Sequence, residues 1–219
     1  MSIVVKTLSE QAYEIIRERI LTHEILPSKP LRQDALSQDL GVSKIPLREA
    51  LTRLEQDGLL SSHPNRGFMV RPLTIAEAED VFHLRGLLEP EAAATACLQA
   101  SSEERANVTR IFQQFDGLSV TQGAQAVTIN REFHLAMIRP LKREVSLRMI
   151  EKLHFLSERY VRMHLEPPQR EQSAYNAHLQ IYEAWMAADA TAVKALLFEH
   201  NANTLADLCQ QIPNEPADD

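Results

Sequence analysis

Three histidines in the second half of the chain occupy positions from which their imidazole rings could act together. His134, His178 and His200 lie in separate helical stretches, and each falls on a stripe of apolar residues that would face a core. A buried polar group without a partner costs about 1–3 kcal/mol, so three inward imidazoles need partners. A shared transition metal such as Zn²⁺ or Ni²⁺ would satisfy all three. Alternatively, each histidine is a hydrogen-bonded residue of the core or of its boundary.

A second group of residues has the chemistry of DNA recognition. The stretch "VSKIPLREALTRLEQDGLL", residues 42–60, predicts a helix whose core-facing stripe consists of Leu47, Ala50, Leu51 and Leu54. Lys44, Arg48 and Thr52 lie on the opposite side. A recognition helix reaches base edges with its N-terminal residues, and a guanidinium can pair with guanine through two hydrogen bonds. We therefore expect Arg48 to contact a base and Lys44 a phosphate or a base, although basic residues on one helix face are also typical of a solvated surface.

The elements before and within this helix predict a winged helix-turn-helix over residues 1–72. A first helix should begin at Ser9, which can cap it, and end before Pro27, and a second short helix should end at Gly41. Ser43 then begins the recognition helix. Pro46 fits its first turn, where a missing N–H is not needed.

Two short strands should follow the recognition helix, at residues 59–62 and 68–71. The turn between them places Arg66 at its tip, where the side chain could enter the minor groove or lie along the DNA backbone. Gly67 follows and would let the chain approach the DNA closely.

The remainder, residues 73–219, predicts an all-α bundle of about six helices. Thr74, Ser101 or Ser102, and Asp189 are suited to cap helices, and the helices should cover about 75–99, 102–116, 122–138, 143–165, 169–188 and the residues after 189. The whole chain has only 6 glycines and 5% aromatic residues, and its stretches rich in Ala, Leu, Glu, Arg and Gln favour helix. The predicted fold class is therefore mainly α.

Charge is distributed unevenly over these two parts, and the net value is −7. Residues 1–72 hold ten Lys or Arg against nine Asp or Glu, whereas residues 73–219 hold thirteen against twenty-one. A locally basic face can still engage phosphates, because exposed charges beyond a Debye length of about 8–10 Å are largely screened. The sequence contains no apolar run near the roughly 20 residues of a membrane span and no signal peptide, so we expect a cytoplasmic protein.

The N-terminal part resembles the DNA-binding half of GntR-type bacterial transcription regulators over residues 8–71. The resemblance lies in "LSQDLGVSKIPLREALTRLEQDGLLSSHPNRGFMV", where G-V-S-(R/K)-x-P-(V/L)-R-E-A-L, L-x-x-(D/E)-G-L and N-R-G occur in order. Departures from the pattern are Lys44, where Arg is usual, and Asp34, where an Arg that contacts DNA is common. The resemblance implies DNA contacts from Arg32, Ser43, Lys44, Pro46, Arg48, Thr52, Asn65, Arg66 and Gly67.

The C-terminal part is similar to the FCD effector domain of FadR-type members of the same family over about residues 75–208. The similar stretches are "HLRGLLEPEAAATA", "NREFHLAM" and "NAHLQIYEAWMAADATAVKALLFEH". In that domain an acidic or amide residue, a histidine four positions later and two histidines from later helices bind a metal, which here implies Asn130, His134, His178 and His200. Asn130 stands where Asp is more usual, and six helices indicate the shorter VanR-like branch.

A metal bound in this way has open coordination positions, and a carboxylate could fill them, so the resemblance implies an organic-acid effector. Arg85, Arg159 and Tyr160 are the candidates for binding the far end of that effector, because an arginine fork suits a carboxylate. A salt bridge to a neighbouring helix is the alternative role for an inward arginine.

These observations predict a transcriptional regulator, a repressor rather than an activator, that binds a palindromic operator as a homodimer. An enzyme is the first alternative, since a three-histidine zinc centre can activate water. However, H-E-x-x-H, P-loop, G-x-G-x-x-G and G-x-S-x-G motifs are absent, and no general base is evident beside the histidines. We therefore expect no enzymatic activity. In the second alternative, the helical part only dimerises and its histidines are structural.

Overall fold

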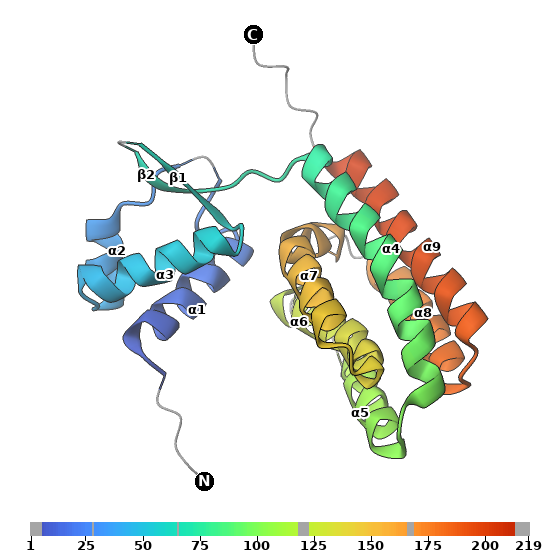
Figure 1. The fold of residues 1–219 in the computed structure, drawn as a ribbon. Coiled ribbons are helices and arrows are strands. Elements are labelled where there is room, and N and C mark those ends of the chain that lie inside the picture. Colours follow the sequence, from blue (N-terminus) through green and yellow to red (C-terminus); the bar gives the residue numbers. More distant parts are fainter. Residues whose placement is uncertain (1–5, 28, 65, 118–122, 166–168, 213–219) are drawn as a thin grey trace. The chain divides into compact units, whose positions relative to one another are not determined.

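The described part of the chain is almost wholly helical. The computed structural model describes residues 6–27, 29–64, 66–117, 123–165 and 169–212. Within these ranges it contains nine α-helices and one pair of strands (Figure 1), which confirms the predicted mainly α fold. The chain divides into two units, Met1–Pro72 and Leu73–Asp219, and each is described by itself.

The N-terminal unit contains three helices, α1 (Leu8–Leu21), α2 (Gln33–Leu40) and α3 (Lys44–Gln56). Helix α1 begins earlier than predicted, because Thr7 rather than Ser9 is its cap. The Thr7 hydroxyl accepts a hydrogen bond from the Glu10 backbone N–H, and the Glu10 carboxylate accepts one from the Thr7 N–H. This reciprocal pair satisfies two donors that a helix start otherwise leaves without partners, and Ser9 offers no equivalent arrangement.

Helix α3 is packed and oriented as its sequence pattern predicts. Leu47, Leu51 and Leu54 are fully buried, and α3 contacts α1, whose Ile16 is equally buried. The turn before α3 passes through Gly41, which ends α2 with a φ of 64°, a conformation that favours glycine. The apolar stripe of α3 therefore fixes which face of the helix remains exposed.

A two-stranded antiparallel wing follows α3. Strand β1 (Leu60–His63) pairs with β2 (Gly67–Val70), with Leu60 opposite Val70 and His63 opposite Gly67. The strands lie one residue away from the predicted ranges, and the left-handed φ of 73° at Gly67 allows the tight reversal.

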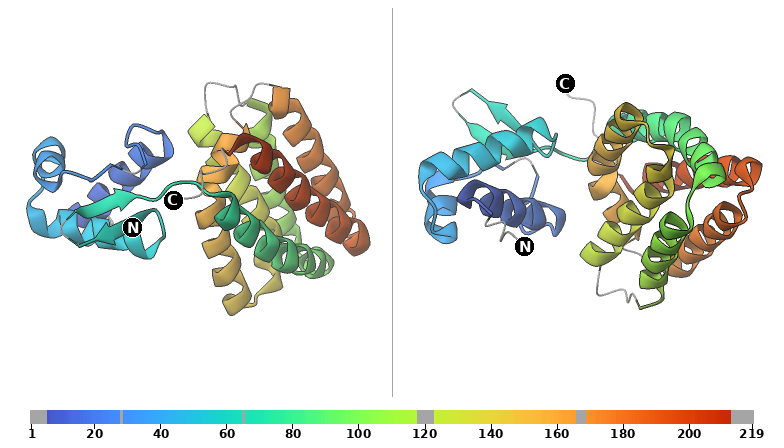
Figure 2. Two further views of the ribbon diagram at one scale, coloured as in Figure 1. Left: turned by 90° about the horizontal axis from the view of Figure 1, so that it is seen from above. Right: turned by 60° about the horizontal axis from the view of Figure 1, so that its bottom comes forward.

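Over its described residues, the C-terminal unit is a bundle of six α-helices, as expected. They are α4 (Ile75–Gln99), α5 (Ser102–Phe112), α6 (Gly123–Ile138), α7 (Glu144–Leu165), α8 (Gln169–Met186) and α9 (Ala190–Gln211), with short 3-10 turns η1 (Gln113–Gly117) and η3 (Arg139–Leu141). Helices α4 and α9 lie side by side (Figures 1 and 2), and α4 also contacts α6 and α7. Thr74, Ser101 and Asp189 cap α4, α5 and α9, which confirms those three predictions.

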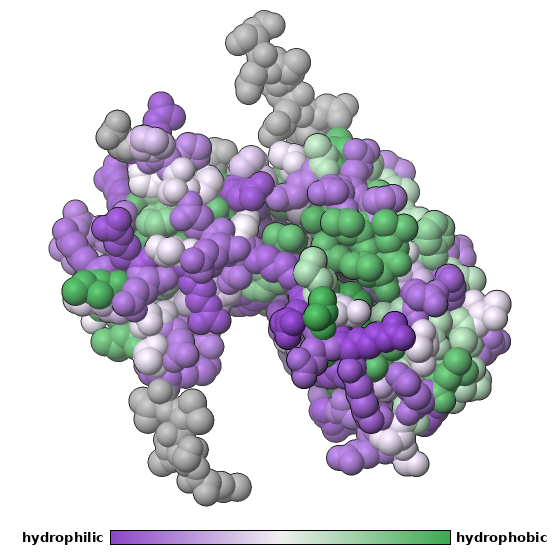
Figure 3. Space-filling model, in the orientation of Figure 1, coloured by the Kyte–Doolittle hydropathy of each residue, from purple (hydrophilic) through white to green (hydrophobic). Residues whose placement is uncertain are grey.

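Part of the surface of this bundle is apolar. Figure 3 shows hydrophobic side chains gathered on the C-terminal unit, over α4 and α7. The exposed large side chains of these two helices include Leu84, Leu87, Leu88, Val145 and Met149. None of the described helices combines the length and the low charge that crossing a bilayer requires.

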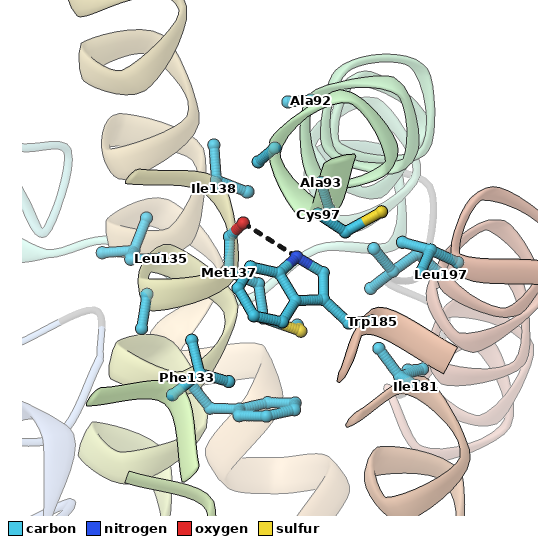
Figure 4. Close-up of a cluster of buried hydrophobic side chains, with 14 of the residues drawn as sticks. Ala92, Ala93, Cys97, Phe133, Leu135, Met137, Ile138, Ile181, Trp185 and Leu197 are labelled. Carbon is cyan, nitrogen blue, oxygen red and sulfur yellow. Dashed lines mark hydrogen bonds between the residues drawn. The ribbon is translucent and has the colours of Figure 1, made fainter. Parts of the chain in front are cut away.

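The centre of the bundle is close-packed around Trp185 of α8 (Figure 4). Its ring is fully buried, and its Nε1 donates a hydrogen bond of 3.1 Å to the carbonyl oxygen of Met137 in α6. Beside it, the rings of Phe112 and Tyr182 stack with centroids 4.4 Å apart. This packing fixes α6 against α8, the two helices that carry His134 and His178.

Candidate functional site

Three helices bring their histidines together in the interior of the C-terminal unit. The Nε2 atoms of His134 and His178 lie 3.4 Å apart, and the ligand nitrogens of these two residues and His200 all lie within 4.8 Å of one another. His134 and His178 are buried, and His200 is half-buried. Burial lowers the pKa of all three imidazoles, so they are neutral at pH 7 and each keeps a nitrogen lone pair that can bind a metal ion.

This donor set fits a transition metal. Two nitrogens that each lie about 2.05 Å from a tetrahedral zinc are roughly 3.3 Å apart, close to the separation of His134 from His178. A hydrogen bond between these two rings would account for that pair, but it would not account for the approach of His200, whose ring centroid lies 4.8 Å from that of His178. Three neutral imidazoles are a usual ligand set for zinc or nickel.

The space beside the histidines is the size of one ion. Asn130, one helical turn before His134 and 5% exposed, lines this inner cavity together with His178 and His200. The centre of a water-sized sphere can occupy a volume of about 10 Å³ inside this cavity, which is enough for a single water or ion. The structure therefore brings three of the proposed ligands, Asn130, His178 and His200, to one cavity, and the nitrogens of His134 lie close to those of the two histidines. Ligation by Asn130 remains a prediction.

A buried carboxylate lies on the other side of His134. Oε2 of Glu89, in α4, lies 3.4 Å from Nδ1 of His134, and Oε1 lies 3.3 Å from Nε2 of His154 in α7. Burial by itself raises the pKa of Glu89, but the Arg85 guanidinium and the two imidazoles outweigh it and hold the pKa well below its usual value. Glu89 is therefore ionised and can accept a hydrogen bond from Nδ1 of His134, which leaves Nε2 of that ring for a metal.

Arg85 is the cation that balances Glu89. Its Nε donates to Glu89 Oε1 at 2.5 Å, and its Nη1 donates to the Ser157 hydroxyl at 3.1 Å. The sequence left open whether Arg85 binds an effector or forms a salt bridge. The structure shows a salt bridge to Glu89 of the same helix rather than to a neighbouring helix, and Arg85 also lines the inner cavity.

The other two predicted effector residues lie on α7. Arg159 and Tyr160 are both buried, with exposed fractions of 5% and 1%. The Tyr160 hydroxyl donates to Glu77 at 2.7 Å and accepts from the Thr74 backbone N–H at 3.2 Å, so it ties α7 to the first turn of α4. Contact between either residue and an effector remains a prediction.

Glu89 and His154 were not assigned to the site from the sequence. One available signal was the spacing of four between Arg85 and Glu89, which places both on one helix face. Nothing in the sequence indicated that α7 would bring His154 to the same carboxylate.

The outer face of α3 carries the predicted DNA contacts. Arg48 and Lys44 are exposed, Thr52 is half-buried, and Pro46 lies in the first turn after Ser43, the residue that precedes the helix. Ile45 is also exposed there, at 73%, and could contact a thymine methyl group, a role that the sequence did not suggest.

The remaining predicted DNA contacts lie before α2 and in the wing. Arg32 precedes α2 and is exposed, and Arg66 and Gly67 lie at the wing turn. Asn65 lies outside the described residues. Asp34 is the unusual acidic residue in the first turn of α2. Its Oδ1 forms an ion pair with Nζ of Lys44 at 2.7 Å, and both side chains are largely exposed.

Comparison with known proteins agrees with this geometry. The family model described as "FCD domain" matches residues 80–203, and the model "Bacterial regulatory proteins, gntR family" matches residues 8–70. The chain is 25% identical to the HTH-type transcriptional repressor RspR of Escherichia coli K12 over 96% of this chain and 92% of that protein. It is 28% identical to the Nta operon transcriptional regulator of Aminobacter aminovorans, over 61% of this chain and 63% of that protein.

Solved structures show the same fold. E. coli McbR/YncC matches 95% of this chain and all of that chain with a TM-score of 0.79 and 23% identity. A GntR regulator from Rhodococcus sp. RHA1 matches 92% of this chain and 97% of that chain with a TM-score of 0.77 and 18% identity. The matched families and relatives are regulators of transcription rather than enzymes. With its exposed recognition helix and its six-helix bundle, the chain belongs to the GntR family of DNA-binding transcriptional regulators and carries a C-terminal FCD effector domain.

Proposed function

We propose that this regulator is a homodimeric repressor whose binding to a palindromic operator is controlled by a small carboxylate at a metal site in the FCD domain. The observation that carries the proposal is the convergence of the nitrogens of His134, His178 and His200 from three helices, beside an ion-sized cavity that His178 and His200 line. The role of repressor is supported by the similarity to RspR, which is named as a repressor. A protein that acts on chromosomal DNA would work in the cytoplasm.

Asn130, His134, His178 and His200 would hold the metal, and zinc or nickel suits their chemistry best. When bound, the metal supplies coordination positions that a carboxylate oxygen can occupy. Glu89 would orient His134, and Arg85 would keep Glu89 ionised. Arg159 and Tyr160 remain our candidates for contact with the effector from α7.

DNA recognition would use the N-terminal half of α3 and the wing. Arg48 would pair with a guanine, Lys44 and Arg32 would contact phosphates or bases, and Arg66 would lie in or along the minor groove. Helix α3 covers only a few base pairs, so two copies related by a two-fold axis would be needed to read a palindromic operator.

A second copy of this chain would cover the apolar face of α4 and α7. Leu87 and Val145 are 58% and 67% exposed, and Leu84, Leu88 and Met149 are further exposed apolar residues of the same two helices. An exposed apolar area that spans two adjacent helices is typical of an interface, and a palindromic operator requires a symmetric one.

Metal analysis of the purified protein, together with thermal melting in the presence of small carboxylic acids, tests the proposal. We expect about one metal ion per chain and a rise in melting temperature with a carboxylate, and we expect His178→Ala to lose both. His83→Ala, which changes an exposed histidine of α4, is the matched control and should retain both.

Absence of metal and of any carboxylate effect in the wild type would refute the sensor part of the proposal. The C-terminal unit would then be a dimerisation domain with structural histidines. The DNA-binding role of α3 would be unaffected, because it depends on the other unit.

A further inference from the structure

A second, larger chamber adjoins the ion-sized cavity. His164, Ala174, His200 and Thr204 line both spaces, so the two lie directly next to each other. The outer chamber offers about 100 Å³ to the centre of a water-sized sphere, ten times the inner value. Because ligand pockets for drug-sized molecules usually measure about 300–1,000 Å³, a chamber of this volume suits a metabolite of few heavy atoms.

One polar stripe of α9 runs from the histidine cluster to the far end of this chamber. It consists of His200, Asn203, Thr204 and Asp207, at spacings of three, four and seven residues. The rise from His200 to Asp207 is about 10 Å at 1.5 Å per residue. A chain of about four carbon atoms could therefore have one end near His200 and the other near Asp207.

Among the described residues that line the chamber, the far end carries a carboxylate. Asp207 contributes a carboxylate whose Oδ2 lies 3.5 Å from Nδ1 of His164, and its side chain is 38% exposed. Asn203 and Ser173 supply neutral polar groups, and the described lining includes no Lys or Arg. In the inner cavity, the Arg85 guanidinium is directed to Glu89 and Ser157.

We propose that this outer chamber binds the far end of the effector and selects a hydrogen-bond donor there, a hydroxyl or an ammonium group, against a second carboxylate. The inference rests on the proposed function, in which one carboxylate of the effector occupies the inner site. The effector is accordingly a small hydroxy or amino monocarboxylate, and Asp207 is the residue that discriminates against dicarboxylates.

Three probes of equal chain length test this selection: 4-hydroxybutyrate, 4-aminobutyrate and succinate. Titration calorimetry with the metal-loaded, full-length protein should show 4-hydroxybutyrate or 4-aminobutyrate binding on the order of tenfold more tightly than succinate, because like charges at close range repel. Asp207→Asn should reduce this ratio to about twofold or less, by strengthening succinate binding. Thermal melting of the variant without ligand monitors its fold.

Glu199→Gln is the matched control, since it removes one negative charge from an exposed position of α9 outside both cavities. This variant should keep the wild-type ratio. Succinate binding to the wild type as tightly as the other two probes, or an unchanged ratio in Asp207→Asn, would overturn the selection by Asp207 and leave the proposed metal and carboxylate site standing. Failure of all three probes to bind protein shown to contain metal would overturn this inference together with the carboxylate effector of the proposed function.

Discussion

Glu89 organises the interior of the C-terminal unit at the scale of single residues. It is fully buried in α4 and contacts Arg85, His134 of α6 and His154 of α7. A carboxylate that accepts from one nitrogen of a metal-binding histidine fixes the orientation and the tautomer of that ring. The geometry of the proposed metal site therefore depends on a residue that would not touch the metal.

Glu89→Gln should weaken metal binding and destabilise the fold. Loss of a partner that orients a ligand typically costs about 10–100-fold in metal affinity. The variant would also leave Arg85 buried without its counter-charge, at a cost of about 3 kcal/mol in the free energy of unfolding. Competition with a zinc chelator and chemical denaturation measure the two effects.

Glu91→Gln is the control on the same helix. Its carboxylate forms an exposed ion pair with Lys194, and such pairs contribute about 0–1 kcal/mol. Wild-type metal affinity in Glu89→Gln would show that Glu89 does not position His134.

The buried histidines predict a pH dependence for the metal-free protein. Burial lowers the pKa of His154 from 6.5 to about 4, so between these values the unfolded chain binds a proton that the folded chain does not. The free energy of unfolding should therefore fall as the pH drops from about 6.5 to about 4, by about 1.4 kcal/mol per pH unit for this residue. Denaturant titrations across this range should give a shallower dependence for His154→Gln and an unchanged one for His83→Gln. An equal slope in all three proteins would contradict the assignment.

At the scale of elements, α3 combines a fully apolar inner face with an outer face that carries cations. Leu47, Leu51 and Leu54 hold the helix in place, which leaves Arg48 exposed in its N-terminal half. Lys44 lies at the helix start but is paired with Asp34 of α2, so a DNA phosphate must compete with that carboxylate.

Arg48→Ala should abolish specific operator binding. Loss of a bidentate contact to guanine costs about 1–3 kcal/mol and relaxes the preference at that base pair, and the proposed dimer would lose this contact in both half-sites. Binding to operator DNA and to mutated operators, measured by fluorescence anisotropy, tests this, with Lys194→Ala in the other unit as the control for charge. Retention of wild-type specificity by Arg48→Ala would refute the role assigned to α3.

Asp34→Asn should have the opposite effect, because it releases Lys44. We expect tighter binding to operator and non-operator DNA alike, and a salt dependence steeper by about two units of slope for the proposed dimer, as one more phosphate contact forms in each protomer. The same anisotropy assay over a range of salt concentrations measures both. An unchanged salt slope would mean that Lys44 makes no phosphate contact.

At the scale of the whole molecule, α4 connects the proposed functions of the C-terminal unit. It carries Arg85 and Glu89 on its inner face and Leu84, Leu87 and Leu88 on its surface, and it contacts α6, α7 and α9. A shift of α4 on ligand binding would therefore reach both the histidine cluster and the proposed dimer face.

Leu87→Asp should convert the proposed dimer to monomers. A charge in the middle of an apolar interface has no partner there, while the monomer keeps its fold because Leu87 is 58% exposed. Analytical ultracentrifugation gives the mass, and operator affinity should fall with it. Phe198→Asp, which changes a similarly exposed apolar residue of α9, should remain dimeric. A stable Leu87→Asp dimer would place the interface elsewhere.

Local patterns in the sequence were sufficient to predict most of the elements of the fold. Apolar spacing predicted α3, because a helix that buries one face must repeat apolar residues at its own period, and cap residues and composition predicted the helices of the bundle. Caps at Thr74, Ser101 and Asp189 were predicted for the same local reason, and the start of α1 was missed because two residues, Thr7 and Glu10, form that cap together.

The candidate site shows where such local reasoning ends. The apolar stripes around His134, His178 and His200 indicated that these rings face inward, but their mutual approach depends on how α6, α8 and α9 pack. The partnership of Glu89 with His154 across 65 residues, the pairing of Lys44 with Asp34 and the chamber next to Asp207 have no sequence signature. Each arises from contacts between separate elements, and the geometry of such contacts is set by the packing of the whole unit rather than by the spacing of residues along one helix.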